Sequence, residues 1–164
     1  MTEPFNIQKY MGTWYELMHY PTWFDKNMSY NTTAVYQFVN NQIQVHNSTM
    51  INGQYFDSYG TAKIISPIQL RVDFPMAEVN KLTSTNQFTL PHDYKNNDEP
   101  NYIIDYIWIN HKGQYIFSVV TDLNKQSLYV LSRFKRPPLQ AYHELMNYIK
   151  QHYDIDKIVQ TPHY

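Results

Sequence analysis

The stretch "YMGTWYELMHYPTWF", residues 10–24, is the most informative for the fold, because it places a tryptophan two residues after Gly12 at the start of an alternating run. Two interpretations of Trp14 are open at this point. It is either a plug for one end of a barrel or a large residue in an ordinary strand. Under both interpretations the alternating pattern predicts a strand over 12–20, with further aromatic residues after it.

The size of the chain and its tyrosine content suit a single domain with an amphipathic interior. The 164 residues are enough to bury a core as one domain over 1–164. Hydrophobic residues make up 43% of the chain, and its 16 tyrosines are among them. A tyrosine ring packs on apolar neighbours while its hydroxyl stays available for water or a partner. We therefore expect buried surfaces that carry hydroxyl groups.

Charge and cysteine content exclude several classes of function. The formal net charge is −1 and the isoelectric point is about 6.6. This balance leaves no electrostatic footprint for nucleic acid, so we expect no nucleic-acid partner. The chain has no cysteine, which removes disulfides, thiol nucleophiles and thiolate metal ligands together.

The first residues bear on location. "MTEPFNIQKY" contains Glu3 and Pro4 and lacks the apolar run of a signal peptide. No stretch approaches the ~20 apolar residues needed to cross a bilayer. Together with the absence of cysteine, these features favour a cytoplasmic location. Removal of a leader from a longer chain is the alternative.

Alternating runs recur along the chain and predict eight antiparallel strands in meander order. The sequence Asn52-Gly53 is typical of a tight hairpin turn between two of them. A helical period appears only near the end, at about 138–152, and a tail follows at 153–164. The prediction is an all-β fold: an eight-stranded antiparallel up-and-down barrel over about 12–134, with one C-terminal helix packed outside. The strands are expected at 12–20, 30–39, 43–51, 55–65, 68–74, 101–109, 115–121 and 127–134.

Two connections are expected at the mouth of this barrel. Residues 75–100 form a polar segment with several prolines that is too long for a simple turn, and a lid is one interpretation of it. The loop after the first strand carries Trp23 and Phe24. Such aromatic residues can shield an apolar ligand or touch a lipid surface, and local loop packing is the alternative.

Three short sequences carry a resemblance to a known family: "GTWYE" at 12–16, "SLYVLSR" at 127–133 and "YDIDKIVQTPH" at 153–163. In this order, around eight expected strands and one helix, they resemble the lipocalin family. Within it, the likeness is to the bacterial outer-membrane and apolipoprotein-D-like branch. The family's second motif usually carries Thr-Asp at the turn before the seventh strand, where this chain has "NHKGQY" at 110–115. The Thr-Asp pair at 121–122 lies one strand later.

The resemblance makes Gly12, Trp14 and Arg133 a structural motif at the closed end of the barrel. The first and last strands meet there, so the guanidinium of Arg133 should lie against the indole. Such a cation–π contact contributes roughly 0.5–2 kcal/mol. Gly12 allows the backbone to turn tightly beneath the ring. We therefore expect these three residues to form a plug rather than to take part in chemistry.

Alternation carried along each strand from the plug predicts which side chains face the cavity. Most of them are aliphatic or aromatic, with a few hydroxyls, as expected of a small-molecule pocket. A barrel filled solid by these rings is the alternative. The predicted ligand-binding residues are Glu16, Met18, Tyr20, Trp23, Ala34, Tyr36, Phe38, Leu70, Val72, Phe74, Tyr106, Trp108, Ser118, Val120, Tyr129 and Leu131.

Glu16 is the carboxylate in this set. Burial disfavours its charged form unless a partner compensates. One interpretation is that it bonds a tyrosine hydroxyl or water. The other is that it contacts the polar head of a ligand.

Sequence signatures of catalytic and metal sites are absent. The chain has no Gly-x-Ser-x-Gly elbow and no His-Glu-x-x-His pair, and its seven histidines are scattered. We expect no enzymatic activity, no metal and no cofactor. The resemblance implies instead binding and transport of a small hydrophobic or amphipathic molecule, such as a fatty acid, a lysophospholipid, or a retinoid- or isoprenoid-like compound.

Two other functions stay open for the same barrel. One is a lipid-modifying enzyme that uses the cavity, and the other is an immune-modulating lipocalin that acts through protein contacts. Further predictions are peripheral membrane contact through the mouth loops and a monomer or weak dimer.

Overall fold

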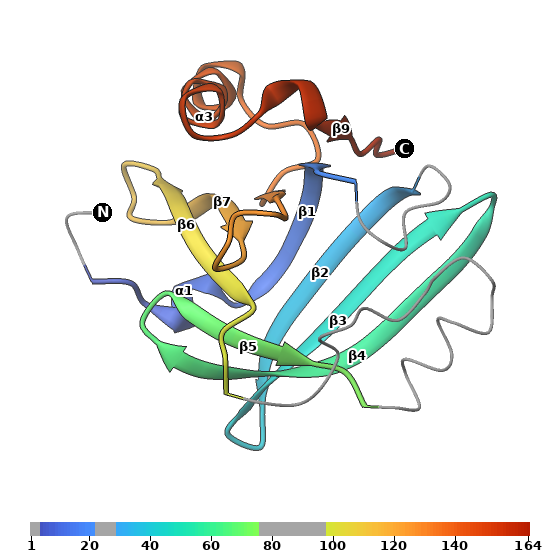
Figure 1. Cartoon of the computed structure of the whole chain (residues 1–164), viewed down its shortest axis with the longest axis vertical. Helices are drawn as coiled ribbons and strands as arrows, with labels where there is room; N and C mark the ends of the chain where they lie inside the picture. The colour runs from blue at the N-terminus through green and yellow to red at the C-terminus, as the bar shows by residue number, and fades with distance from the viewer. Residues whose placement is uncertain (1–3, 22–28, 76–97) are drawn as a thin grey trace.

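The computed structural model describes residues 4–21, 29–75 and 98–164. Antiparallel strands follow one another around a barrel in chain order, and β1 pairs with both β8 and β2, which closes the wall (Figure 1). The predicted all-β up-and-down barrel is therefore confirmed. The strands are β1 (Gly12–His19), β2 (Ser29–Val39), β3 (Gln42–Ile51), β4 (Gln54–Ser66), β5 (Gln69–Asp73), β6 (Tyr102–Ile109), β7 (Tyr115–Thr121) and β8 (Tyr129–Ser132).

The β2–β3 and β3–β4 hairpins each turn on two consecutive residues with a left-handed backbone conformation. Asn40 and Asn41 have φ of 53° and 63°, and Asn52 and Gly53 have φ of 52° and 79°. Two consecutive positive φ angles are what a two-residue type I′ turn needs, and asparagine and glycine adopt them most readily. The hairpin predicted at Asn52-Gly53 is confirmed by the pairing of Ile51 with Gln54.

Four elements lie outside the eight-stranded wall. The predicted helix is α3 (Leu139–His152), which lies outside the barrel (Figure 1). It begins after Pro138, whose carbonyl accepts a hydrogen bond from the backbone N–H of Tyr142 at 3.0 Å. The other three were not predicted from the sequence: α1 (Ile7–Tyr10), the 3₁₀ turn η1 (Ile155–Lys157) and β9 (Val159–Gln160).

The C-terminal segment completes the wall between β1 and β2. These strands pair directly only over 12–15 and 33–36. Further along β1, β9 pairs with Met18 and His19. The backbone N–H of Thr161 donates to Leu17 O at 2.9 Å, and that of Asn31 on β2 donates to Pro162 O at 2.8 Å. Residues 159–162 thus bridge β1 and β2 where these two strands no longer pair with each other.

Hydrophobic side chains form two layers, one on each side of the wall. The inner core fills the barrel around Trp14, Tyr36 and Leu70. The outer layer lies between the wall and α3, where Leu145 and Ile149 have no exposed surface. All seven residues of β7 are buried because this strand contacts both layers.

Hydrogen bonds to β6 fix α3 and the chain after it against the wall. The hydroxyls of Tyr148 and Tyr153 both donate to Asp105 Oδ2, each at 2.8 Å. Trp108 Nε1 donates to Glu144 Oε2 at 2.5 Å. Burial and the Asp105 carboxylate raise the pKa of both tyrosines. These hydroxyls therefore stay protonated and able to donate at neutral pH.

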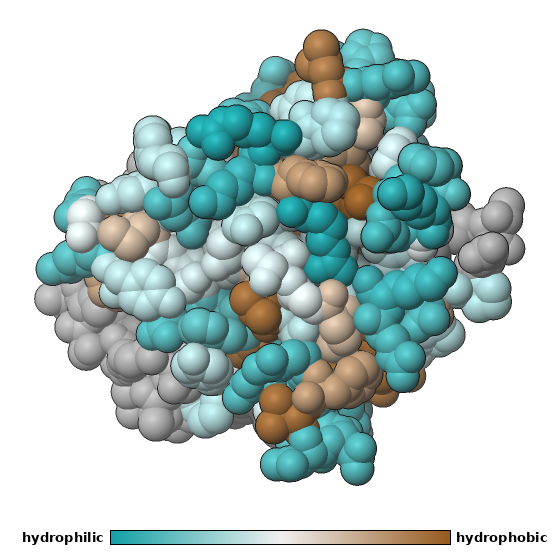
Figure 2. Space-filling view, turned by 180° about the vertical axis from the view of Figure 1, so that it is seen from behind, coloured by the Kyte–Doolittle hydropathy of each residue, from teal (hydrophilic) through white to brown (hydrophobic). Residues whose placement is uncertain are grey.

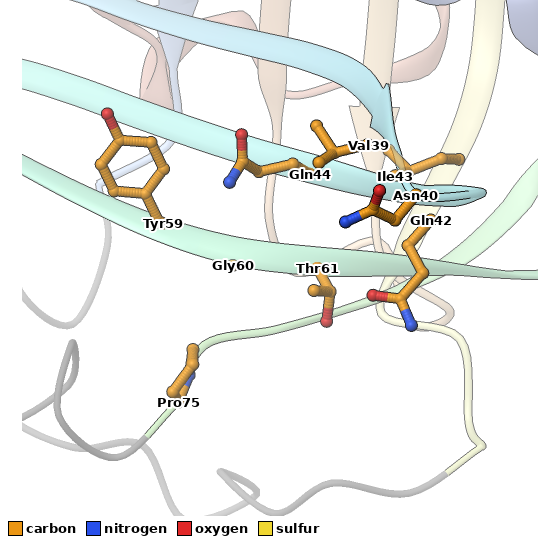
Figure 3. Close-up of a pocket in the computed structure, with 9 residues that line it drawn as sticks. All are labelled: Val39, Asn40, Gln42, Ile43, Gln44, Tyr59, Gly60, Thr61 and Pro75. Carbon is orange, nitrogen blue, oxygen red and sulfur yellow. The ribbon is translucent and has the colours of Figure 1, made fainter.

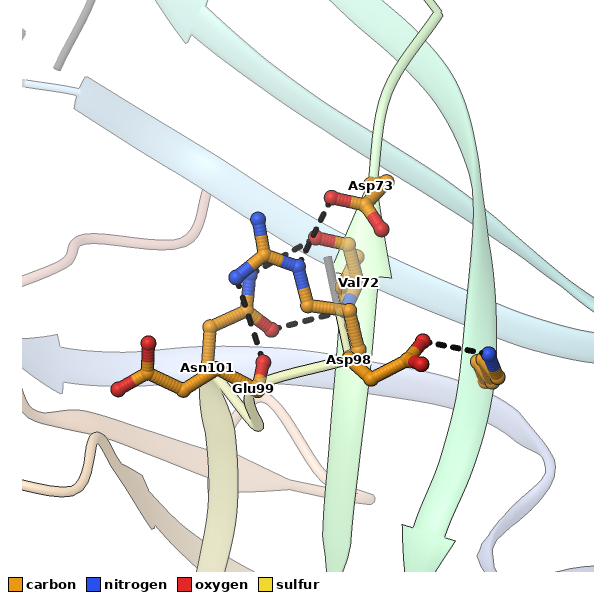
Figure 4. A network of polar contacts seen from close by, with 7 residues as sticks. Val72, Asp73, Asp98, Glu99 and Asn101 are labelled. Carbon is orange, nitrogen blue, oxygen red and sulfur yellow. Dashed lines mark hydrogen bonds and ion pairs between the residues drawn. The ribbon is translucent and has the colours of Figure 1, made fainter. Parts of the chain in front are cut away.

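A side chain extends the short ladder between β5 and β6. Backbone pairing joins these strands at Gln69–Ile103 and Leu70–Tyr102. Beyond it, the Asn101 amide accepts from Val72 N at 2.8 Å and donates to Val72 O at 2.9 Å (Figure 4). The side chain of Asn101 thus takes the place of a further backbone pair.

On the face opposite to that of Figure 1, the surface has no large continuous hydrophobic patch. Figure 2 shows a mainly hydrophilic face with small, separate hydrophobic patches. Within the described ranges, no helix combines the length and hydrophobicity required to cross a bilayer.

Candidate functional site

The closed end of the barrel is sealed by Trp14 and Arg133, as predicted. Arg133 Cζ lies 3.7 Å from the centroid of the indole, which is fully buried. Gly12 has φ of +106°, which favours glycine, and a Cβ there would stand 3.2 Å from Arg133 Nη1 and would crowd the guanidinium. The guanidinium donates to four backbone carbonyls, those of Lys9, Met11, Thr13 and Tyr115.

Tyr10 lies on the inner side of this plug and forms the floor of the barrel. Trp14 Nε1 donates to Tyr10 O at 2.8 Å, and the two rings lie 5.0 Å apart. Tyr10 is the last residue of α1, four residues before Trp14, and its ring is part of the inner core. This residue was not predicted from the sequence; its position in the turn before "GTW" was the available signal.

Four hydroxyls form a connected network on this floor. Tyr10 OH lies 2.7 Å from Ser118 Oγ and 2.7 Å from Tyr102 OH, and Tyr36 OH lies 2.9 Å from Tyr102 OH. Burial raises the pKa of Tyr10 to about 12 and holds the pKa values of Tyr36 and Tyr102 well above their ordinary value. The network is therefore neutral throughout the physiological range. Ser118 and Tyr36 were predicted to face inward, whereas Tyr102 was missed.

Several other predicted pocket residues lie on the inner face of the wall. Phe74 is half-buried, and its ring lies over Gly60, where a Cβ would stand 2.7 Å from it. Val72 and Tyr129 are partly buried against the inner core. The buried members of that core from the predicted set are Ala34, Tyr36, Leu70, Val120 and Leu131.

The prediction that Met18 and Tyr20 face the cavity is wrong. The pairing of β1 with β8 shifts register between Glu16 and Met18, because Glu16 is opposite Leu131 whereas Met18 is opposite Val130. This bulge adds one residue, so every later side chain changes face. Met18 and Tyr20 belong to the outer layer.

A second bulge overturns the prediction for Tyr106 and Trp108. The register of β6 against β7 shifts between Ile104 and Tyr106. As a result Tyr106 and Trp108 pack in the outer layer, and Ile104 and Ile107 take the inward positions.

Two predicted residues are not enclosed by the described wall for other reasons. Phe38 pairs with Ile43 near the end of β2, where it is 45% exposed. Phe38 therefore has the predicted inward register, since Ile43 belongs to the inner core, but its side chain at the strand end is not enclosed. Trp23 and Phe24, and the predicted lid over most of 75–100, lie outside the described residues.

Glu16 is buried, and its partners are residues that were not predicted. Thr161 Oγ1 donates to Glu16 Oε2 at 2.5 Å, and His19 Nδ1 lies 3.1 Å from both of these oxygens. Since the one hydroxyl proton of Thr161 is used toward Glu16, the Nδ1 of His19 must carry the proton in its contact with Thr161. His163 Nε2 also lies 2.6 Å from Glu16 O. Glu16 thus anchors the C-terminal segment.

A separate pocket of about 260 Å³ lies against the outside of β3 and β4 (Figure 3). Gln44 and Thr61 are paired there, on the face opposite to Ile43 and Ala62 of the inner core. Because this pocket lies on the outer face of the wall, it is not the predicted site inside the barrel. Across the described ranges, no group of three or more histidine, aspartate or glutamate side chains could hold a metal ion.

Comparison with known proteins agrees with the barrel fold. The family model described as a lipocalin-like domain matches residues 5–99. A putative lipocalin of Acanthamoeba polyphaga mimivirus is 32% identical over 158 residues, which cover 95% of this chain and 83% of that protein. The chain is a lipocalin. Temperature-induced lipocalin-1 of Arabidopsis thaliana is 25% identical over 166 residues, covering 96% of this lipocalin and 78% of that protein.

Solved structures share the fold of this lipocalin at low sequence identity. The cockroach allergen Per a 4 superposes with a TM-score of 0.65 at 15% identity, covering 100% of this lipocalin and 94% of the allergen. Insecticyanin from the tobacco hornworm Manduca sexta gives 0.56 at 18% identity, covering 99% and 88%. At these identities the likeness concerns the fold alone.

Proposed function

We propose that this lipocalin binds and carries one small hydrophobic or amphipathic molecule inside its barrel. The main support for this proposal is that Val72, Tyr102 and Tyr129 face the inner core and yet keep part of their surface exposed. Below them the floor is sealed by Tyr10 and Trp14, which have no exposed surface. Accessible apolar surface above a closed floor is what a ligand would cover, at about 25 cal/mol for each Å² removed from water.

The inner wall supports a carrier rather than an enzyme. Its described polar groups include hydroxyls bonded to one another and Glu16, whose carboxylate is engaged by Thr161 and His19. No nucleophile is set beside a free general base in this arrangement, so the proposed role requires no reaction and no cofactor. A fatty acid, a lysophospholipid, or a retinoid- or isoprenoid-like molecule is the proposed ligand class.

Other parts of the proposal rest on the sequence. Membership of the bacterial outer-membrane and apolipoprotein-D-like branch rests on the "YDIDKIVQTPH" tail at 153–163. A single domain over 1–164, a monomeric or weakly dimeric state, a cytoplasmic location and membrane contact through the mouth loops are further parts of the same proposal.

Native mass spectrometry of the purified protein, followed by organic extraction, tests the carrier function directly. We expect a co-purifying mass that is released unchanged into solvent. Chemical conversion of added lipid by the protein would favour the enzyme instead.

A matched pair of variants tests whether binding occurs inside the barrel. Val72→Trp fills the inner face, whereas Gln37→Trp adds the same ring on the exposed outer face of β2. With the neutral dye Nile red as probe, we expect Val72→Trp to weaken binding by about tenfold or more and Gln37→Trp to leave it unchanged. Equal affinities for both folded variants would contradict a barrel site.

A further inference from the structure

The hydroxyl network on the barrel floor is assembled from four separate elements. Tyr10 comes from α1, Tyr36 from β2, Tyr102 from β6 and Ser118 from β7. Their oxygens form an unbranched chain in the order Ser118, Tyr10, Tyr102, Tyr36, with links of 2.7, 2.7 and 2.9 Å. A core that only needed filling could use phenylalanine at these positions, so the hydroxyls call for an explanation of their own.

A count of protons shows that the network has one hydrogen-bond donor to spare. Four hydroxyls carry four protons, and the three links use three of them. Ser118 and Tyr10 have no exposed surface and Tyr36 has 4%, whereas Tyr102 is only partly buried. When Ser118 donates to Tyr10, and Tyr10 and Tyr36 both donate to Tyr102, the spare proton lies on Tyr102. The donor is then on the one accessible member of the network.

The charges around the network favour a neutral acceptor over an anion. Arg133 acts electrostatically on Tyr10 and Tyr102 from the other side of Trp14, but its guanidinium already donates to backbone carbonyls. On the described inner wall His19 Nδ1 lies 3.1 Å from the Glu16 carboxylate, so this pair adds no net positive charge that would attract an anion. Burial keeps the tyrosines protonated, and the same low dielectric penalises an anionic head placed beside them.

We propose that the Tyr102 hydroxyl, oriented by Tyr10 and Tyr36, donates a hydrogen bond to a neutral oxygen of the carried molecule. The ligands are then long-chain alcohols, aldehydes, ketones or esters rather than fatty-acid anions. This inference rests on the proposed carrier function and narrows its ligand class.

Three probes with one polyene chain test the inference: parinaryl alcohol, methyl parinarate and parinaric acid, titrated by fluorescence at neutral pH. We expect the alcohol and the ester to bind about tenfold more tightly than the carboxylate. Tyr102→Phe keeps the ring and removes the donor, so it should weaken the alcohol and ester by about three- to tenfold and leave the acid unchanged. Tyr55→Phe, on the outer wall where the residue is 59% exposed, is the matched control and should change none of the three.

A second variant and an infrared measurement test the same hydrogen bond in other ways. Tyr36→Phe removes one hydrogen bond that orients Tyr102, and we expect a smaller loss for the same two neutral probes. The infrared carbonyl band of methyl parinarate should lie at lower frequency in the wild type than in Tyr102→Phe. Tightest binding of the acid, or unchanged alcohol binding in folded Tyr102→Phe, would overturn the inference while leaving the carrier function intact. Failure of all three probes and of Nile red to bind would overturn the carrier function itself.

Discussion

Arg133 Cζ lies 3.7 Å from the centre of the Trp14 indole, although 118 residues separate the two in the chain. The contact joins β1 to the chain just after β8, at the point where the barrel is sealed. Because the guanidinium also donates to carbonyls on both sides of Gly12, it ties α1, β1 and the end of β8 together.

Trp14→Ala should therefore affect stability far more than binding. Removing a fully buried tryptophan leaves a cavity and should lower the free energy of unfolding by about 3–5 kcal/mol. Chemical denaturation measures this loss, and Nile red titration of the folded fraction should show little change. Tyr55→Ala, at a 59% exposed position, is the control. Equal thermal midpoints for the wild type and Trp14→Ala would refute the structural role.

Thr161→Val should loosen the C-terminal segment. The variant keeps the side-chain shape but removes the hydroxyl that donates to the buried Glu16, at a cost of about 1–3 kcal/mol. Hydrogen exchange at residues 159–162 should become faster, since these residues join β1 to β2. Thr61→Val, at an exposed position on β4, should leave the exchange unchanged. Wild-type exchange rates in Thr161→Val would contradict this anchoring role.

Alkaline pH should destabilise the fold through the floor tyrosines. The pKa of Tyr10 is raised to about 12 in the folded state by burial, whereas the unfolded chain ionises near pH 10. Above about pH 10 the unfolded state therefore binds fewer protons, and the free energy of unfolding falls as pH rises. Below about pH 10 the contribution of Tyr10 to the free energy of unfolding does not change with pH. Denaturation across this range measures the slope, which should be shallower in Tyr10→Phe; an unchanged slope would argue against burial of this hydroxyl.

Asp122 should stabilise the turn before β8 except in acid. Burial acts to raise its pKa, but hydrogen bonds from Ser127 Oγ and from the backbone N–H groups of Gln126, Asn124 and Ser127 outweigh it, and the pKa is lowered. The stabilisation is thus present above about pH 4 and is lost as pH falls through the lower folded value.

Asp122→Ala measures this contribution. We expect a loss of about 1 kcal/mol at neutral pH, because the carboxylate is only partly buried, and convergence with the wild type in strong acid. Asp156→Ala, at an exposed carboxylate in η1, is the control. A loss that persists undiminished in acid would point to the turn's shape rather than to its charge.

The candidate site was predicted in part. Inward positions such as Ala34 and Leu131 follow from alternation, because Ala34 pairs directly with Trp14 and Leu131 lies two residues before Arg133 on the same strand run. Met18 and Trp108 were assigned to the wrong face because each follows a bulge. A bulge depends on how two strands match in length and register, and alternation within one strand does not reveal it.

The barrel is predictable from the sequence, because alternation, asparagine-rich turns and the late helical period are local properties of neighbouring residues. Which polar groups meet inside the barrel depends on the tertiary structure. Tyr10 and Tyr102 are 92 residues apart, and Glu16 and Thr161 are 145 apart. Their contacts depend on barrel closure and on strand register, which many residues set together and no single segment encodes.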